Sequence, residues 1–254
     1  MRLVTKLSSI AISTAFGKTL RDFVVPPVCL VCEARVAIQG GVCSGCWSQM
    51  RFVERPFCEI LGTPFPHDQG EGAISPQAIA DPPPFDRLRS SVLYDAFGRS
   101  LVSGLKFGDR SDLAPWMAGW MMFAGRELFE KCDAVVPVPL HWRRLHERRY
   151  NQSAELARHI AASAGISYRP LVLVRHRATE QQIGLSALAR SRNVQGAFRV
   201  PPPARPEIEG RRILLVDDVY TTGATVKACA RALKRAGVTG IDVLTFARVA
   251  SGVI

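Results

Sequence analysis

Two adjacent carboxylates and a group of hydroxyls lie within thirteen residues of the sequence, ILLVDDVYTTGAT, at positions 213–225. The four aliphatic residues before Asp217 and Asp218 are typical of a buried strand that ends at the two acids. After the acids come three threonines around a glycine, followed by a helical pattern. The segment therefore predicts a strand, a turn and a helix, with reactive side chains gathered at the turn.

The predicted turn is suited to binding a phosphate group. Threonine hydroxyls and the backbone N–H groups at the start of a helix can hold a phosphate dianion, and the helix dipole favours its charge. Glycine at the centre lets the chain approach the phosphate closely. The residues predicted to bind a 5′-phosphate are Thr221, Thr222, Gly223, Ala224 and Thr225.

The two carboxylates favour a neutral hydrogen-bond donor beside that phosphate. Asp217 and Asp218 can each accept charge-assisted hydrogen bonds from the vicinal hydroxyls of a ribose, whereas a second anion would be repelled. Together, the acids and the turn predict a site for a 5′-phosphorylated ribose.

Other interpretations of the acidic pair are weaker. GKT at residues 17–19 resembles the end of a nucleotide-triphosphatase phosphate loop, but that loop needs glycine where this chain has Ile12. A receiver domain would need more than the 36 residues that follow Asp218. A plain helix start capped by Thr221 or Thr222 remains an open alternative.

Four of the seven cysteines form two closely spaced pairs in CLVCEARVAIQGGVCSGC. Each two-residue gap allows both sulfur atoms of a pair to face one ion, which is typical of a structural tetrahedral zinc site. Disulfides or a redox CxxC motif are the competing interpretations. The predicted zinc ligands are Cys29, Cys32, Cys43 and Cys46.

The remaining cysteines carry weaker signals. Cys58 could belong to a second, decayed knuckle, while Cys132 and Cys229 have apolar neighbours and are interpreted as core residues.

The hydrophobic pattern predicts an α/β fold with a doubly wound, mostly parallel sheet and a small N-terminal zinc ribbon. The expected domains are an N-terminal helix and zinc module at 1–60, a Pro- and Gly-rich linker at 61–90 and the α/β domain at 91–254. Within the last domain we expect strands at 91–95, 133–140, 170–174, 211–218 and 240–249, and helices around Leu101 and Leu105 and at 113–131, 147–165 and 223–237.

Composition limits the possible classes of protein. The chain has 254 residues, of which 47% are hydrophobic, and no apolar run is long enough to span a membrane. The start imitates a secretory signal, but serines interrupt its apolar stretch, so an amphipathic helix and a cytoplasmic location are expected. A net charge of +11 favours a partner rich in phosphate.

Four segments in order resemble the ComF family, which joins a four-cysteine zinc module to a type I phosphoribosyltransferase domain. Residues 213–225 resemble the phosphoribosyl-pyrophosphate signature of such domains. The other three are YDAFGRSLVSGLKFGDR, VVPVPLHWRRLHERRYNQ and RATEQQIGLSALARSRNVQGAF. The chain departs from the family pattern at Arg149, at Ala189 and at Leu61, where a further cysteine often follows Cys58.

This resemblance implies a site and a cofactor. Asp217 and Asp218 would act on the ribose in a transfer that displaces pyrophosphate, with Mg²⁺ bridging pyrophosphate and ribose oxygens. The stretch from Arg175 to Arg192 could form a lid. The candidates for binding pyrophosphate or another anion are Lys106, His141, Arg143 and Arg144. The acceptor substrate is not identified.

A second hypothesis comes from another class of function. ComF-type proteins resemble competence factors, and HWRRLHERRY carries arginines between Trp142 and Tyr150, a pattern suited to single-stranded DNA. The chain would then be a non-catalytic DNA-binding factor in DNA uptake, possible partners being other competence proteins. The alternative is that both rings pack on the fold and the arginines are solvated.

Overall fold

The computed structural model describes residues 26–107, 110–141, 150–177 and 187–250. The chain separates into two compact units, residues 1–49 and residues 50–254. The predicted N-terminal helix lies outside the described residues. None of the described helices is both long and apolar enough to cross a membrane.

The first unit is a small zinc-ribbon module. An isolated antiparallel bridge joins Val28 to Arg35, and Gly40 adopts a positive φ of 77° in the turn that leads to the second pair of cysteines. The short helix α2, Ser44–Trp47, follows, and Cys43 caps it by accepting a hydrogen bond from the Cys46 amide.

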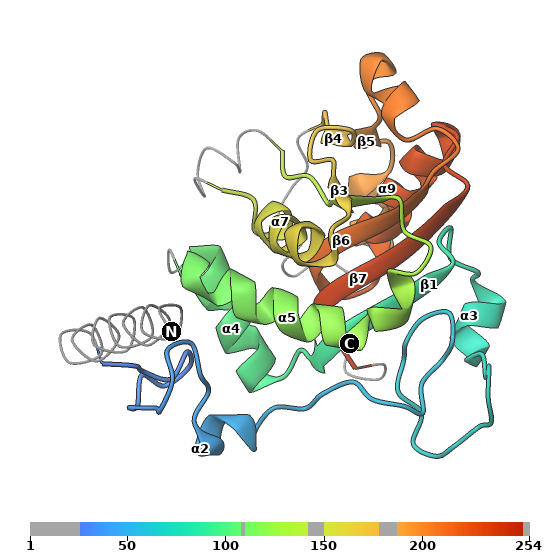
Figure 1. Cartoon of the computed structure of the whole chain (residues 1–254). Helices are drawn as coiled ribbons and strands as arrows, with labels where there is room; N and C mark the ends of the chain where they lie inside the picture. Colours follow the sequence, from blue (N-terminus) through green and yellow to red (C-terminus); the bar gives the residue numbers. More distant parts are fainter. Residues whose placement is uncertain (1–25, 108–109, 142–149, 178–186, 251–254) are drawn as a thin grey trace, which may run out of the picture. The chain divides into compact units, whose positions relative to one another are not determined.

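The second unit is built on a five-stranded sheet with the order β1-β7-β6-β2-β3 (Figure 1). All four neighbouring pairs are parallel. The strands are β1 (Arg87–Leu93), β2 (Ala134–Pro137), β3 (Ser167–Tyr168), β6 (Arg212–Tyr220) and β7 (Gly240–Arg248). A separate antiparallel pair joins β4 (Val174–Arg175) to β5 (Phe198–Arg199).

Helices cover both faces of the main sheet (Figure 1). On one side α5 and α7 contact each other and the central strands, while α9 packs against β6 and β7 from the other. The α-helices of this unit are α3 (Pro76–Ala80), α4 (Ala96–Phe107), α5 (Ala114–Ala124), α7 (Gln152–Ala164), α8 (Ala187–Val194) and α9 (Ala224–Arg235). Three short 3₁₀ turns lie at Ser111–Leu113, Arg126–Leu128 and Pro202–Glu207.

Burial on both faces explains the aliphatic character of the central strands. All nine residues of β7 are buried, as are seven of the nine in β6, where only Arg212 and Val219 are partly buried. A parallel sheet covered on both faces requires such continuous apolar runs. The predicted doubly wound α/β fold with its N-terminal zinc ribbon is therefore confirmed.

Several predicted elements have different limits. The apolar run 170–174 is not a strand of the main sheet; Val172 and Leu173 are buried in a loop, and the edge strand β3 precedes them. A short apolar run does not by itself distinguish a strand from a buried loop. The helix expected at 113–131 ends at Ala124, and a 3₁₀ turn follows Gly125.

Residues 50–90 are part of the second compact unit. Several of their side chains are buried, among them Ser75, Ala78 and Phe85. The predicted boundaries near residues 60 and 90 stay predictions, but the Pro- and Gly-rich stretch between them packs as structured chain.

Candidate functional site

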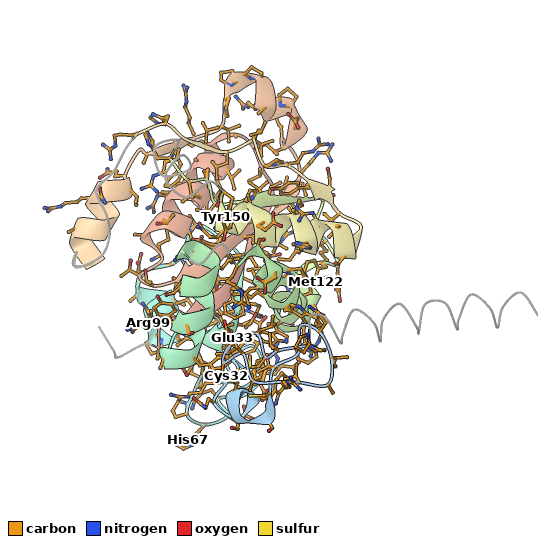
Figure 2. All side chains as sticks on the ribbon, turned by 90° about the vertical axis from the view of Figure 1, so that its left-hand side faces the viewer. Cys32, Glu33, His67, Arg99, Met122 and Tyr150 are labelled. Atoms are coloured by element: carbon orange, nitrogen blue, oxygen red, sulfur yellow. The ribbon has the colours of Figure 1, made fainter. Side chains whose placement is uncertain are left out.

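The four paired cysteines form a compact cluster in the first unit. Their sulfur atoms all lie within 4.8 Å of one another. Four thiolates around a zinc ion, each about 2.3 Å from the metal, produce sulfur–sulfur distances of this kind. Cys32, labelled in Figure 2, is the most exposed of them, whereas Cys29 and Cys46 are buried. The donor set therefore fits a structural zinc ion.

The surroundings of Cys29 favour the thiolate that a metal requires. Burial opposes ionisation, but backbone N–H groups around the sulfur outweigh it and lower the pKa of Cys29 to about 6. One of these donors is the Cys43 amide, 3.3 Å from the Cys29 sulfur. All seven cysteines are free of disulfides in the structure, which supports the zinc interpretation over the disulfide alternative.

The two adjacent acids lie within the C-terminal part of β6. Lys106 of α4 places its Nζ 2.7 Å from Asp218 Oδ2. Ser153 of α7 donates its hydroxyl to Asp217 Oδ1 at 2.9 Å, and the Asp218 amide donates to the same oxygen at 2.9 Å. Each carboxylate thus has a partner from a different helix.

The surroundings of the site shift the pKa values of Asp217 and Lys106. Burial and the neighbouring charge of Asp218 raise the pKa of Asp217 to about 7, against the opposing effect of the Ser153 hydroxyl. Burial alone would lower the pKa of Lys106, but the charges of Asp218 and Asp217 raise it instead. The site therefore holds the Lys106–Asp218 ion pair beside the Asp217 carboxyl, which titrates near neutral pH.

The turn after β6 presents groups that could receive an anion. Gly223 has a φ of 76° and precedes α9, whose N-terminus has no side-chain cap. A Cβ at this position would lie 2.5 Å from the Tyr220 hydroxyl, so only glycine fits. The Thr222 hydroxyl is buried and has no hydrogen-bond partner among the described residues. The amides at a helix N-terminus and the buried Thr222 hydroxyl suit a phosphate.

Arg248, at the end of β7, lies beside Tyr220 at the start of the turn, and the sequence interpretation missed it. Its guanidinium lies 5.7 Å from the centre of the Tyr220 ring and donates to the Leu61 carbonyl at 2.5 Å and to Thr63 Oγ1 at 2.7 Å. Burial lowers the pKa of Arg248 to about 10. The sequence offered one signal for Arg248: it is an arginine at the end of a long, mostly apolar strand segment.

The start of α7 also contributes groups that were missed. Asn151 caps the helix through the Ser153 amide, and its Nδ2 donates to the Val138 carbonyl at 3.1 Å, joining α7 to the loop after β2. Tyr150, labelled in Figure 2, donates its hydroxyl to the Leu105 carbonyl of α4. This contact favours the interpretation in which Tyr150 packs on the fold.

The other predicted site residues are only partly brought together. His141 follows β2 and is buried, while Arg143 and Arg144 lie outside the described residues. Lys106 contacts an acid of the predicted ribose site, so its role as a separate anion ligand stays a prediction. Thr221 and Thr225 are partly buried and Ala224 is buried.

The predicted lid is also incompletely described, because residues 178–186 are outside the described ranges. Arg175 lies 5.4 Å from the Phe198 ring centre in the β4–β5 pair. Arg177 donates to the carbonyls of Asn193 and Gln195.

Comparison with known proteins matches both parts of the chain. Residues 20–77 match the double zinc ribbon domain, and residues 151–253 match the phosphoribosyl transferase domain. The chain is 32% identical over 231 residues to the DNA utilization protein YhgH of Escherichia coli K12, covering 88% of this chain and 98% of that protein.

Two competence proteins are similar over most of their length as well. Competence protein F of Haemophilus influenzae is 28% identical, with 87% of this chain and 96% of that protein covered. Competence protein ComFC of Bacillus subtilis is 25% identical, with 77% and 79% covered. The chain belongs to the ComF family. This ComF chain thus combines a zinc ribbon with a phosphoribosyltransferase-type domain.

The raised pKa of Asp217 predicts an unusual dependence of stability on pH. Its ordinary value is 3.8, so between about pH 4 and pH 7 the folded state keeps a proton that the unfolded chain releases. The carboxyl therefore destabilises the fold increasingly as the pH rises through that window. We expect Asp217→Asn to increase the free energy of unfolding by about 1–3 kcal/mol more at pH 8 than at pH 4.5.

Chemical denaturation at the two pH values measures this difference. Asp68→Asn is the control, because Asp68 is exposed and an asparagine can still accept the hydrogen bond from the Gly70 amide. An Asp217→Asn variant whose stabilisation is equal at both pH values, or larger at pH 4.5, would contradict the assignment.

The zinc cluster predicts a local effect of losing one ligand. Cys43→Ser should remove zinc and unfold residues 26–49, while the second compact unit stays folded. Elemental analysis and thermal denaturation monitored by circular dichroism measure the two effects. Cys132→Ser, outside the cluster, should keep its zinc; loss of zinc from this control, or its retention in Cys43→Ser, would refute the assignment.

Proposed function

We propose that this ComF chain binds phosphoribosyl pyrophosphate or a related 5′-phosphoribosyl ligand at the C-terminal end of β6. The observation that carries the proposal is a buried acidic pair whose second member, Asp218, lies five residues before Gly223, the N-cap of α9, where no side chain caps the helix. Ligands of parallel α/β sheets bind beyond the carboxyl ends of the strands, where such groups meet.

The acids suit the ribose part of the ligand. Lys106 forms an ion pair with Asp218, and the Ser153 hydroxyl donates a hydrogen bond that orients Asp217. Both carboxyl groups can accept hydrogen bonds from vicinal hydroxyls, and the raised pKa of Asp217 reduces the charge that a nearby phosphate would meet.

The turn suits the 5′-phosphate. The Gly223 backbone, the amides that begin α9 and the Thr222 hydroxyl supply several donors within one turn of chain. The partly buried Thr221 and Thr225 hydroxyls would add further donors.

The pyrophosphate part would need cations. His141 lies after β2, at the same end of the sheet as the acids, and remains a candidate with Arg143 and Arg144. When bound with such a ligand, Mg²⁺ supplies charge neutralisation at the pyrophosphate oxygens.

Transfer of the phosphoribosyl group to an acceptor extends the proposal. Breaking the bond to pyrophosphate builds positive charge on the ribose, and nearby carboxylates stabilise that charge only if they bind the transition state more strongly than the substrate. Release of pyrophosphate in a screen of acceptors would establish the reaction.

Thr222 provides a sharp test of the phosphate turn. Thr222→Val keeps the shape and branching of the side chain but removes the hydroxyl, so we expect the affinity for phosphoribosyl pyrophosphate with Mg²⁺ to fall at least about tenfold. Thr222→Ser keeps the hydroxyl and is expected to bind within about threefold of the parent.

Isothermal titration calorimetry measures both variants. Equal binding by Thr222→Val and the parent would exclude the turn as the phosphate site. A parent protein that binds neither phosphoribosyl pyrophosphate nor a nucleoside 5′-monophosphate would refute the proposed function itself.

Binding of single-stranded DNA is a second candidate function, favoured by a basic cavity and by the names of the relatives. A cavity of about 350 Å³ is lined by Gln195, Gly196, Phe198, Ala228, Arg231 and Arg235. Both arginines are exposed, and neither makes an ion pair with any residue that the structure describes. Helix α9 contains no acidic residue, so its exposed face can attract phosphates.

The basic cavity predicts a change in the salt dependence of DNA binding. Arg231→Gln with Arg235→Gln should weaken binding and reduce the slope of log affinity against log salt concentration by about 1.4, because two phosphate contacts are lost. Arg158→Gln with Arg205→Gln removes the same charge from arginines already paired with glutamates.

Fluorescence anisotropy with a single-stranded oligonucleotide, measured at several salt concentrations, compares the two double variants. Equal slopes in both would mean that the cavity does not contact DNA. The arginine-rich segment 142–149, which lies outside the described residues, would then remain the candidate for contacting DNA. A role with other DNA-uptake proteins would also remain a candidate function.

A further inference from the structure

Residues 57–80 repeat the backbone geometry of the zinc ribbon. In the ribbon, the Cys29 amide donates to the Ala34 carbonyl at 2.7 Å; in the later segment, the Cys58 amide donates to the Thr63 carbonyl at 2.8 Å. An antiparallel bridge joins the residue before each cysteine to the residue six positions after that cysteine, Val28 to Arg35 and Phe57 to Pro64. The two chain reversals therefore have the same register.

The repeat includes an unusual backbone conformation. Glu33 and Gly62, each four residues after its cysteine, have positive φ angles of 62° and 58°. Each donates its amide to the carbonyl of that cysteine, at 3.1 Å and 2.7 Å. Glu33 is the only non-glycine residue with positive φ in the described chain. Its match to Gly62 indicates that both loops are knuckles of one type.

The second half of each segment also matches. Cys43 caps α2 and accepts from the Cys46 amide, while Ser75 caps α3 and accepts from the Ala78 amide. The capping residue also donates its amide to the sulfur of the leading cysteine, from Cys43 at 3.3 Å and from Ser75 to Cys58 at 3.2 Å. The four pairs of equivalent positions are Cys29 and Cys58, Cys32 and Leu61, Cys43 and Ser75, and Cys46 and Ala78.

The second set of positions lacks the chemistry of a zinc site. Cys58 is the only thiol among the four, whereas structural zinc requires four nitrogen, sulfur or carboxylate ligands. Leu61 and Ala78 supply no ligand atom and belong with Cys58 to the hydrophobic core. The Cys58 sulfur accepts hydrogen bonds from the amides of Leu61 and Ser75. All four side chains are buried.

Two buried arginines hold the backbone of this segment. Arg248 donates to the Leu61 carbonyl and the Thr63 hydroxyl, as described above. Arg89 of β1 donates to the Glu59 carbonyl at 2.7 Å and to the Glu59 carboxylate at 2.5 Å. Both arginines are 2% exposed. Gly62 packs so closely that a Cβ there would collide with the Leu88 carbonyl.

We propose that residues 57–80 are a second ribbon that holds no metal ion, and that the α/β core stabilises it in place of zinc. Although the chain matches a double zinc ribbon domain, it therefore binds one zinc ion, at Cys29, Cys32, Cys43 and Cys46. The former metal centre has become part of the core that carries Arg248.

Metal content tests the first part of this proposal. The purified protein should contain one zinc ion per chain by elemental mass spectrometry, and Cys58→Ser should retain it. Two ions per chain in the parent, or loss of zinc in a folded Cys58→Ser variant, would overturn the proposal. This measurement needs no phosphoribosyl ligand, so its result is independent of the proposed function.

A gain of metal binding tests the equivalence of the four positions. Leu61→Cys, Ser75→Cys and Ala78→Cys together would place four thiols on a backbone that already has the knuckle geometry, and we expect two zinc ions per chain. Cobalt(II) substitution should double the thiolate absorption per chain relative to the parent. Control substitutions Leu61→Ser and Ala78→Ser should leave one ion.

The triple-cysteine variant remains informative if Cys58→Ser does not fold. A folded triple variant that still binds a single metal ion would show that residues 57–80 do not have ribbon geometry and would overturn the proposal.

Discussion

Two adjacent carboxylates buried at one end of a sheet are the constraint on which much of this structure depends. In a low-dielectric site, both cannot ionise without a nearby positive charge or hydrogen-bond donors. Lys106 and Ser153 provide them from α4 and α7, which lie far apart in the sequence. Burial and the neighbouring charge of Asp218 also raise the pKa of Asp217.

Buried arginines impose a second constraint on the edge of the sheet formed by β1 and β7. Arg89 is paired with the carboxylates of Glu59 and Glu127, whereas Arg248 contacts a carbonyl, a hydroxyl and an aromatic ring. Burial without a carboxylate partner is consistent with the lowered pKa of Arg248. These contacts fix residues 59–63, which precede β1, to the core. Through Arg248 they also lie near Tyr220, which begins the turn between β6 and α9.

The two ribbons illustrate alternative ways to stabilise the same backbone. Leu30 is the only apolar side chain other than cysteine that is buried among the described residues of the first unit, so hydrophobic burial there is small. A metal ion supplies the folding free energy that such small modules lack. The segment 57–80 packs within the larger unit, where Leu61 and Ala78 are buried in a common core. Burial of apolar side chains can therefore stabilise it without a metal.

The sequence by itself determined the fold class, the zinc ligands and the strand–turn–helix around the acids. Each of these depends on local spacing: two-residue gaps between cysteines, a continuous aliphatic strand, and threonines and glycine before a helix. The sequence did not identify Ser153 or Arg248 as site residues, and it suggested Cys58 only as a decayed knuckle. Those contacts join residues 64 and 187 positions apart, and no local pattern encodes such pairs. Only the tertiary structure decided them, because parallel strands bring distant segments to one end of the sheet, where burial makes every unpaired charge costly.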